Sequence, residues 1–437
     1  MKKLSFETYI ILACSISTFL TGFSSNAISV ALPQIASTFV FNNILQNWVP
    51  NAFFLTVAIL SVPLAKICSD YGLKKSFVIS LIVFLMGAIL SVVSLSGEMF
   101  FISRIIQGIA AGGIYVTSVT IMVNQVSPKR RGRALGMNVA AVYIGLSLAP
   151  VLGGILTHNF GWESIFIFTI PFLLLNILIA HFKIPEDKKT INNEPFDKVG
   201  SILYMLGIGL IIFGFSSLND SFGLITLVIG IILLSGFFIY DHYHEFPVFN
   251  VKLFQNHKFL SANLASLISY IATILVTMVL NYHLQYIRGM NSQSAGLILI
   301  VTPLLMAIVA PQSGKLSDKI NPQKISALGM GLVTIALFIF SFLDEGMSIY
   351  LLIFAMVLQG IGYGLFSSPN TNTIMSSVPP KETPAASASL STMRVIGQTL
   401  SIAMVTVIFA IVIGSGDIVP SVYPQLIQGS KYAFGIS

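Results

Sequence analysis

The chain has 437 residues, of which 55% are hydrophobic and only 9% are charged. Soluble domains carry about a quarter of their residues as charged side chains, so this composition excludes an ordinary soluble protein and a large soluble catalytic domain. The mean hydropathy of the whole chain is +0.88, so apolar residues are not confined to one anchor, and we expect the lipid bilayer to surround most of the protein. In such a protein the net charge of +7 indicates membrane orientation rather than a nucleic-acid partner.

Runs of about 20 apolar residues predict membrane-spanning helices, because such a helix matches the thickness of the hydrocarbon core. The first run follows Met1 to Lys3 without a small-residue cleavage site, so we expect a retained helix rather than a secretory signal. The thirteen predicted helices cover residues 8–31, 46–66, 76–96, 99–124, 133–157, 163–182, 199–217, 222–240, 260–286, 293–313, 324–343, 348–375 and 386–413.

Positive charge is distributed unevenly among the predicted loops. With the N-terminus in the cytoplasm, all but three of the 23 Lys and Arg residues fall in cytoplasmic segments, with Arg394 counted among them. Arg288 and Lys431 would lie outside, and Arg104 would lie within a helix. The positive-inside rule therefore predicts a multi-pass protein of the plasma or inner cell membrane with a cytoplasmic N-terminus.

Two connecting segments bear on the domain organisation. Residues 183–198 are rich in charge of both signs and read as a solvated linker between two bundles. Residues 414–429 are expected to emerge outside the membrane, and residues 431–437 look like the first turns of one more helix. The last helix is therefore expected to be absent or cut short.

Short motifs occur twice in the chain in the same order. Residues 107–109 and 359–361 both read Gln-Gly-Ile, and residues 65–75 echo residues 314–324. A duplication of this kind predicts two homologous halves with a substrate site at their interface near the membrane midplane. The predicted organisation is a six-helix bundle over residues 1–182, a linker with two inserted helices over 183–258, and a second bundle with an incomplete final helix over 259–437.

The repeated segments 65–75 and 314–324 have the residues of a gating loop. A glycine allows a tight helix exit, an aspartate can cap a helix or pair with a cation, and lysines suit a cytoplasmic surface. An ordinary basic loop would explain the charges but not the recurrence in both halves. The expected gating residues are Asp70, Gly72, Lys74 and Lys75 in the first half and Gly314, Asp318 and Lys319 in the second.

The predicted helix 133–157 carries small residues and a proline at a specific spacing, namely Gly136, Gly145, Pro150, Gly153 and Gly154. Together with the gating loops and the segment from Arg104 to Gln107, this pattern resembles the major facilitator superfamily, in particular its fourteen-helix drug:proton antiporter branch. The resemblance covers nearly the whole chain. It implies an all-α membrane fold of two six-helix bundles with two inserted helices, and the export of small amphipathic compounds by alternating access, with proton coupling left open. Generic small-residue packing is the alternative reading of the glycines.

Two positions depart from the family pattern. Ser24 and Ser69 stand where the resemblance implies aspartates, and no carboxylate falls in the middle of a predicted helix. Proton coupling usually needs a buried titratable group, so His283 becomes the candidate proton carrier, with a satisfied interfacial histidine as the alternative. A cavity with Arg104 and no acid favours neutral or anionic cargo over cations.

Polar or aromatic side chains that interrupt apolar helices are the candidate lining of a substrate cavity. For Arg104, snorkelling toward the membrane surface is the alternative, and for the others it is interhelical hydrogen bonding worth about 0.6–2 kcal/mol. The expected cavity residues are Ser24, Asn26, Trp48, Asn51, Phe53, Arg104, Gln107, Asn138, Tyr143, Gln359, Tyr363 and Gln398.

The sequence offers little support for enzyme chemistry. It contains neither a phosphate-binding Gly-x4-Gly-Lys-Ser/Thr loop nor a His-Glu-x-x-His zinc motif, so we expect no cofactor and no metal site. Cys14 and Cys68 lie in or beside apolar runs and read as small hydrophobic residues. A membrane receptor or scaffold that keeps a transporter fold is the rival interpretation, because the last helix and the first gating loop depart from the expected pattern.

Overall fold

The computed structural model describes residues 6–41, 43–186, 195–217, 221–412 and 422–436. In this part of the chain the regular structure is helical and contains no β-strand. Thirteen helices within it are long and apolar enough to cross a membrane. The prediction of an all-α membrane fold is therefore confirmed.

The first half of the chain forms six helices. They are α1 (Phe6–Phe39), α2 (Asn43–Tyr71), α3 (Leu73–Val92), α4 (Gly97–Gln125), α5 (Arg131–Phe160) and α6 (Glu163–Lys183). At the start of α4, the Ser96 side chain caps the helix by accepting a hydrogen bond from the Met99 backbone N–H. The Phe100 ring lies 5.2 Å from the Trp162 ring, centre to centre, so aromatic contacts join α4 to the start of α6.

Helices α7 (Lys198–Ser216) and α8 (Ser221–Tyr243) form the predicted inserted pair. They approach closely because glycines face each other's backbones: a Cβ at Gly214 would lie 2.7 Å from the Leu227 nitrogen, and one at Gly230 would lie 2.8 Å from the Ile211 nitrogen. The hairpin packs on α2 and α14. Residues 187–194 of the expected linker lie outside the described residues.

The second half contains α9 (His257–Tyr282) with a π-helical extension (His283–Ile287), α10 (Ser292–Leu299), α11 (Val301–Ser317), α12 (Pro322–Phe340), α13 (Ile349–Ser376), α14 (Thr383–Val412) and α15 (Tyr423–Ile436). The single helix expected over 293–313 is divided into α10 and α11. Pro303 has no N–H to donate to the carbonyl of Leu299, which accounts for the interruption near Ile300.

The structure corrects the expected end of the chain. Residues 422–429, which were expected to form part of an external loop, belong instead to the start of α15 or the turn before it. The helix begins eight residues earlier than the turns expected from residue 431, and α15 packs against α14 and α12. Residues 413–421 lie outside the described part of the chain.

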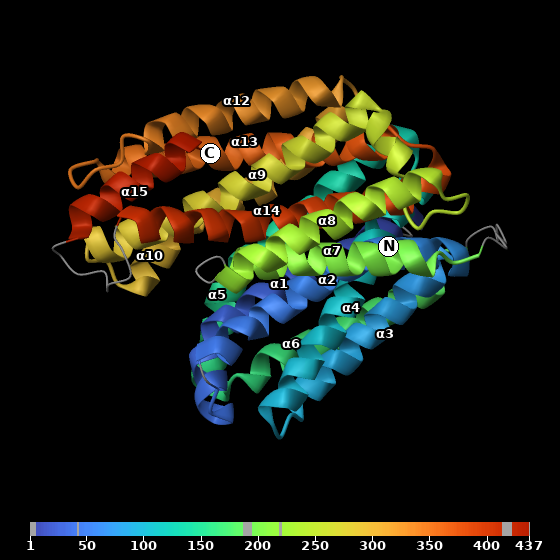
Figure 1. The fold of residues 1–437 in the computed structure, drawn as a ribbon, viewed down its shortest axis with the longest axis horizontal. Coiled ribbons are helices and arrows are strands. Elements are labelled where there is room, and N and C mark those ends of the chain that lie inside the picture. The colour runs from blue at the N-terminus through green and yellow to red at the C-terminus, as the bar shows by residue number, and fades with distance from the viewer. Residues whose placement is uncertain (1–5, 42, 187–194, 218–220, 413–421, 437) are drawn as a thin grey trace, which may run out of the picture.

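Helices α1 to α6 pack mainly with one another, and α9 to α15 form a second group. The ribbons of the two groups diverge toward the left of Figure 1 and converge toward the right, where the chain begins. Contacts of Glu7 with Ser127 and Arg130 place the start of α1 beside the start of α5 at this end. We call it the gate end, because the loops that join α2 to α3 and α11 to α12 also lie there.

Candidate gate and substrate site

The two halves meet at the gate end through the carboxylate of Asp318, which follows α11. One carboxylate oxygen accepts a hydrogen bond from the Gly132 backbone N–H at 2.6 Å, and the other accepts from the Arg133 N–H at 3.0 Å. Both donors belong to the first turn of α5, where helix N–H groups have no intrahelical partner. Asp318 of the second half therefore caps a helix of the first half, and its negative charge suits the positive end of the helix dipole.

Backbone packing around this cap depends on glycine. The carbonyl oxygen of Gly132 occupies the space that a Cβ at Gly314 would need, and a Cβ at Gly136 would lie 2.5 Å from the Ala310 carbonyl oxygen. Ser368 of α13 adds a hydrogen bond of 3.3 Å to the Gly132 carbonyl. The halves thus touch backbone to backbone, and a side chain at Gly132 or Gly314 would force them apart.

Opposing influences act on the Asp318 carboxyl. Burial is the largest and raises its pKa, while the N–H donors of Arg133 and Gly132 and the charge of Arg131 lower it. The pKa is raised overall, so burial outweighs the hydrogen bonds and the nearby charge, and the net energy of this contact is modest. A contact of that kind suits an interface that forms and breaks repeatedly.

The first copy of the gating loop is arranged differently. Asp70 forms an ion pair of 3.7 Å with Lys66, one turn earlier in α2. Gly72 has φ +98° at the start of α3, a backbone conformation that requires glycine. Lys74 is partly buried, while Lys75, like Lys319 of the second loop, is exposed.

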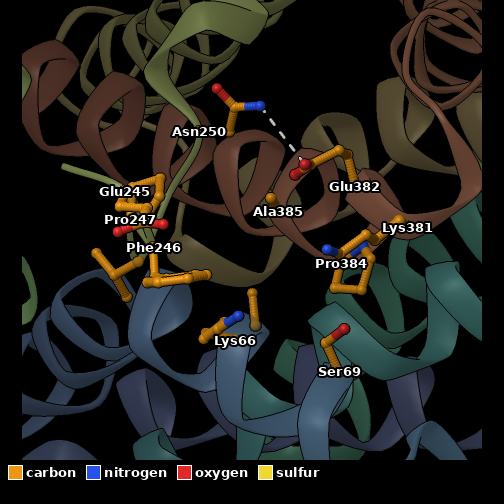
Figure 2. Close-up of a pocket in the computed structure, with 12 residues that line it drawn as sticks. Lys66, Ser69, Glu245, Phe246, Pro247, Asn250, Lys381, Glu382, Pro384 and Ala385 are labelled. Carbon is orange, nitrogen blue, oxygen red and sulfur yellow. Dashed lines mark hydrogen bonds between the residues drawn. The ribbon is translucent and has the colours of Figure 1, made fainter. Parts of the chain in front are cut away.

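A cavity of about 250 Å³ lies where the repeat would place a second aspartate cap. In the repeat, Ser69 corresponds to Asp318, and Pro384 at the start of α14 corresponds to Gly132. Figure 2 shows Ser69 facing Pro384 in this cavity, with Lys66 and Lys381 nearby. The serine is too short to replace the carboxylate, and proline has no N–H to donate. The gate is therefore asymmetric: one half provides the cap, and the other leaves a hollow between α2, α14 and the segment before α9.

Arg104 is fully buried among three of the residues that were expected beside it in the cavity. Its Nη1 donates to Gln107 Oε1 at 2.5 Å and to Ser24 Oγ at 3.5 Å, and its guanidinium lies 4.9 Å from the centre of the Phe53 ring. Gln107 donates in turn to Ser91 Oγ at 2.9 Å. The side chain points inward instead of toward the membrane surface, and Ser24, at the expected aspartate position, lies directly against it.

The other expected cavity residues lie in several places. Within the first half, Thr18 donates to Asn138 Oδ1 at 2.8 Å, and the Trp48 ring stacks 5.5 Å from Phe213 of α7. Within the second half, the Thr302 hydroxyl lies 3.5 Å from Gln359 Oε1 and Tyr363 is fully buried. Asn26, Asn51 and Gln398 are partly buried. Most of these side chains thus contact residues of their own half or the inserted hairpin.

Tyr143 is the expected cavity residue that bridges the two halves. Its hydroxyl on α5 lies 3.1 Å from the Ser367 hydroxyl on α13. Arg394 was counted with the cytoplasmic charges, which is wrong, because it lies well inside α14. The predicted helix 386–413 already contained Arg394, so its position in that span was the signal that could have identified it.

The remaining predicted residues are His283 and the small residues of α5. His283 is fully buried, and its Nε2 accepts a hydrogen bond from Arg288 Nε at 3.1 Å. On α5, a Cβ at Gly145 would lie 2.5 Å from the Phe19 carbonyl oxygen, and Gly153 faces Ala27, so this face of α5 packs on α1. Gly154 lies beside Val30 of α1, and Pro150 lies inside the helix. The small residues of α5 therefore pack against α1 at Gly145, Gly153 and Gly154, and against α11 at Gly136.

A membrane protein of two helical groups that meet at one end has the architecture of a transporter. The profile of the Major Facilitator Superfamily matches residues 14–402, and the chain belongs to that family of membrane transporters. The riboflavin transporter RibZ of Clostridioides difficile is 28% identical over 404 residues, which cover 92% of this chain and 88% of that protein. The lincomycin resistance protein LmrB of Listeria monocytogenes is 23% identical over 398 residues, covering 90% and 84%.

Solved structures agree on the fold. The human organic anion transporter MFSD10 (TETRAN) superposes with a TM-score of 0.69 at 14% sequence identity, covering 99% of both chains. The proton:xylose symporter XylE superposes with a TM-score of 0.65 at 15% identity, covering 99% of this chain and 93% of that one. These likenesses establish the major facilitator fold.

Proposed function

We propose that this transporter exports small amphipathic compounds from the cytoplasm by alternating access, with the gate end and the N-terminus on the cytoplasmic side of the cell membrane. The observation that carries the proposal is the Asp318 cap on Gly132 and Arg133, which joins the halves through hydrogen bonds of modest net energy. The names of the relatives, one for riboflavin and one for lincomycin resistance, support a small-molecule cargo. The concentration of Lys and Arg at the gate end supports the orientation.

The proposal includes the exchange of substrate for protons. Position 24 has no carboxylate to carry the proton. Ser24 occupies that place against Arg104, and His283 remains the candidate carrier. Its Nε2 accepts from Arg288, so the imidazole is unprotonated at that nitrogen, and protonation would break this hydrogen bond. A proton on His283 would therefore loosen the connection after α9, which is a route by which protonation could affect the conformation.

The test uses purified protein reconstituted into liposomes, with rhodamine 6G as a cationic probe, fluorescein as an anionic probe and 7-ethoxycoumarin as a neutral one. We expect saturable flux of at least one probe above that of protein-free liposomes. A pH gradient should accelerate the flux if protons are exchanged, and His283→Gln should remove that acceleration. Monodisperse, folded protein without flux of any probe would favour the receptor or scaffold interpretation and overturn the proposal.

A further inference from the structure

Arg394 is a second arginine within the membrane-spanning part of the chain. It lies in the α14 segment Thr383–Val412, and its Nε donates a hydrogen bond to the Tyr270 hydroxyl of α9 at 3.1 Å. Its guanidinium carbon lies 5.1 Å from the centre of the Tyr115 ring and 5.4 Å from that of Tyr270. Tyr115 belongs to α4 of the first half, so the arginine bridges the two halves through aromatic rings.

Within the described part of the chain, no carboxylate pairs with this cation. An arginine at the centre of a membrane helix costs about 2.5–3.5 kcal/mol even on the mildest scales, and such residues are normally paired. Among the described residues, Arg394 makes its hydrogen bond and ring contacts with tyrosines, and no carboxylate forms an ion pair with it. Tyr143, with its hydroxyl bonded to Ser367, adds another neutral group. The group that would balance the charge of Arg394 is an anion.

Arg104 and Arg394 differ in accessibility. Arg104 has no exposed surface and is enclosed by Gln107, Ser24 and Phe53. Arg394, Tyr115 and Tyr270 are only partly buried, although they face one another from helices of both halves. The two terminal nitrogens of Arg394 make no hydrogen bond within the described part of the chain. A ligand at the terminal nitrogens of Arg394 would displace no existing hydrogen bond, whereas Arg104 is fully buried.

We propose that Arg394, Tyr115 and Tyr270 form the binding site for an anionic aromatic substrate. The terminal guanidinium nitrogens would hold its carboxylate through paired, charge-assisted hydrogen bonds, and the tyrosine rings would pack on its aromatic body. This assignment deepens the proposed function, on which the transport role of the site rests; binding is measurable apart from transport. Arginine stays charged at all accessible pH values, so affinity should follow the ionisation of the ligand's acid and fall when that acid is protonated.

Opening either side of the transporter would change this site. Tyr115 belongs to the first half and Arg394 to the second, so movement between the halves alters the distance between ring and guanidinium. A planar anion held between them would favour the conformation in which they are close. Substrate binding is thereby linked to the conformational change, because a ligand shifts the equilibrium toward the state that it binds more tightly.

The experiment measures binding of fluorescein and rhodamine 6G to the purified full chain by fluorescence anisotropy at neutral pH. Both dyes have a xanthene ring system, but fluorescein carries a free carboxylate and negative charge, whereas rhodamine 6G is an ester with positive charge. We expect fluorescein to bind at least tenfold more weakly to Arg394→Gln than to the unaltered protein, and rhodamine 6G to bind no more weakly. Lys431→Gln, which removes an exposed cation on α15, should leave fluorescein affinity within twofold.

Two further variants keep the test decisive. Arg394→Lys retains the charge but not the planar fork, and should weaken fluorescein binding by a smaller factor. Tyr115→Ala removes the ring and should also weaken it. Should Arg394→Gln fail to fold, these two variants decide the result. Unchanged fluorescein affinity in the folded Arg394 and Tyr115 variants overturns the site. Fluorescein flux that is independent of Arg394 would overturn the site while leaving the transport function standing, and Arg394-dependent binding without flux would do the reverse.

Discussion

The hydroxyl of Tyr204 in α7 lies 2.6 Å from the hydroxyl of Thr392 in α14. It also donates to the backbone carbonyl of Ala58 in α2 at 3.0 Å, so Thr392 is the donor in the first bond. A single buried side chain of the inserted hairpin therefore contacts a helix of each half. The hairpin is thus attached where α2 and α14 would move relative to each other, and Tyr204 connects that movement to α7.

Replacing Tyr204 with phenylalanine removes both hydrogen bonds and keeps the ring. We expect the protein to lose about 1–3 kcal/mol of stability, because each of the two bonds contributes about 0.5–1.5 kcal/mol. Hydrogen exchange should become faster in α7, and the melting temperature should fall. Tyr243→Phe is the matched control, since Tyr243 of α8 is 83% exposed. Equal exchange rates in α7 of the two variants would show that Tyr204 does not anchor the hairpin.

A disulfide between α2 and α14 should arrest the transporter with its gate end closed. The Ser61 and Ser391 hydroxyl oxygens lie 3.3 Å apart, which places the two side chains side by side, as a disulfide requires. In a background with Cys14→Ala and Cys68→Ala, oxidation of the Ser61→Cys, Ser391→Cys pair should stop dye flux, and a reductant should restore it. Neither single cysteine should respond. Undiminished flux through fully cross-linked protein would contradict alternating access at this interface.

Removing the Asp318 carboxylate should weaken the closed gate. Asp318→Ala leaves the N–H groups of Gly132 and Arg133 without their acceptors, so the closed state becomes less populated and dye flux should slow severalfold. Asp318→Asn, which keeps one acceptor oxygen, should have an intermediate effect. The rate at which the cysteine pair described above forms its disulfide reports the closed population. Lys252→Ala, at an exposed lysine before α9, serves as the control, and a disulfide rate as fast in Asp318→Ala as in this control would rule out the cap as a gate element.

Hydrophobic runs and repeated motifs were sufficient to predict the all-α fold, because helix length is set by bilayer thickness and a gene duplication preserves short segments such as 107–109 and 359–361. Contacts between the two halves could not be predicted in the same way. Nothing local to Asp318 indicates that its partner is the backbone of Gly132, since N–H donors have no sequence signature.

Charge counting also misplaced one functional candidate. Arg394 was counted with the cytoplasmic charges although the predicted helix 386–413 contains it, whereas the structure surrounds it with tyrosines from other helices. Tyr115 and Tyr270 become recognisable as its neighbours only when α4, α9 and α14 are placed side by side. Residues that share a helix face can be predicted from spacing, but those that meet from three helices cannot.

Ser24→Asp should stabilise the protein by placing a negative charge beside Arg104, whose present hydrogen-bond partners are neutral. Ser24 is buried with its hydroxyl 3.5 Å from Arg104 Nη1, while Nε and Nη2 of the arginine have no hydrogen-bond partner within the described chain. A carboxylate here would form a charge-assisted hydrogen bond, worth about 1.5–3 kcal/mol, against the desolvation of its own charge. We therefore expect a higher melting temperature than for Ser24→Asn, which has a similar size without the charge.

Ser25→Asp separates the effect of pairing from that of adding a charge. Ser25 is also buried, but its hydroxyl donates to the Gly22 carbonyl instead of approaching Arg104, so an aspartate there would be desolvated without a cation and should destabilise the protein. Opposite shifts in melting temperature for these neighbouring substitutions would identify the Arg104 guanidinium as the cause. A Ser24→Asp protein no more stable than Ser24→Asn would mean that Gln107 and Phe53 already satisfy the arginine.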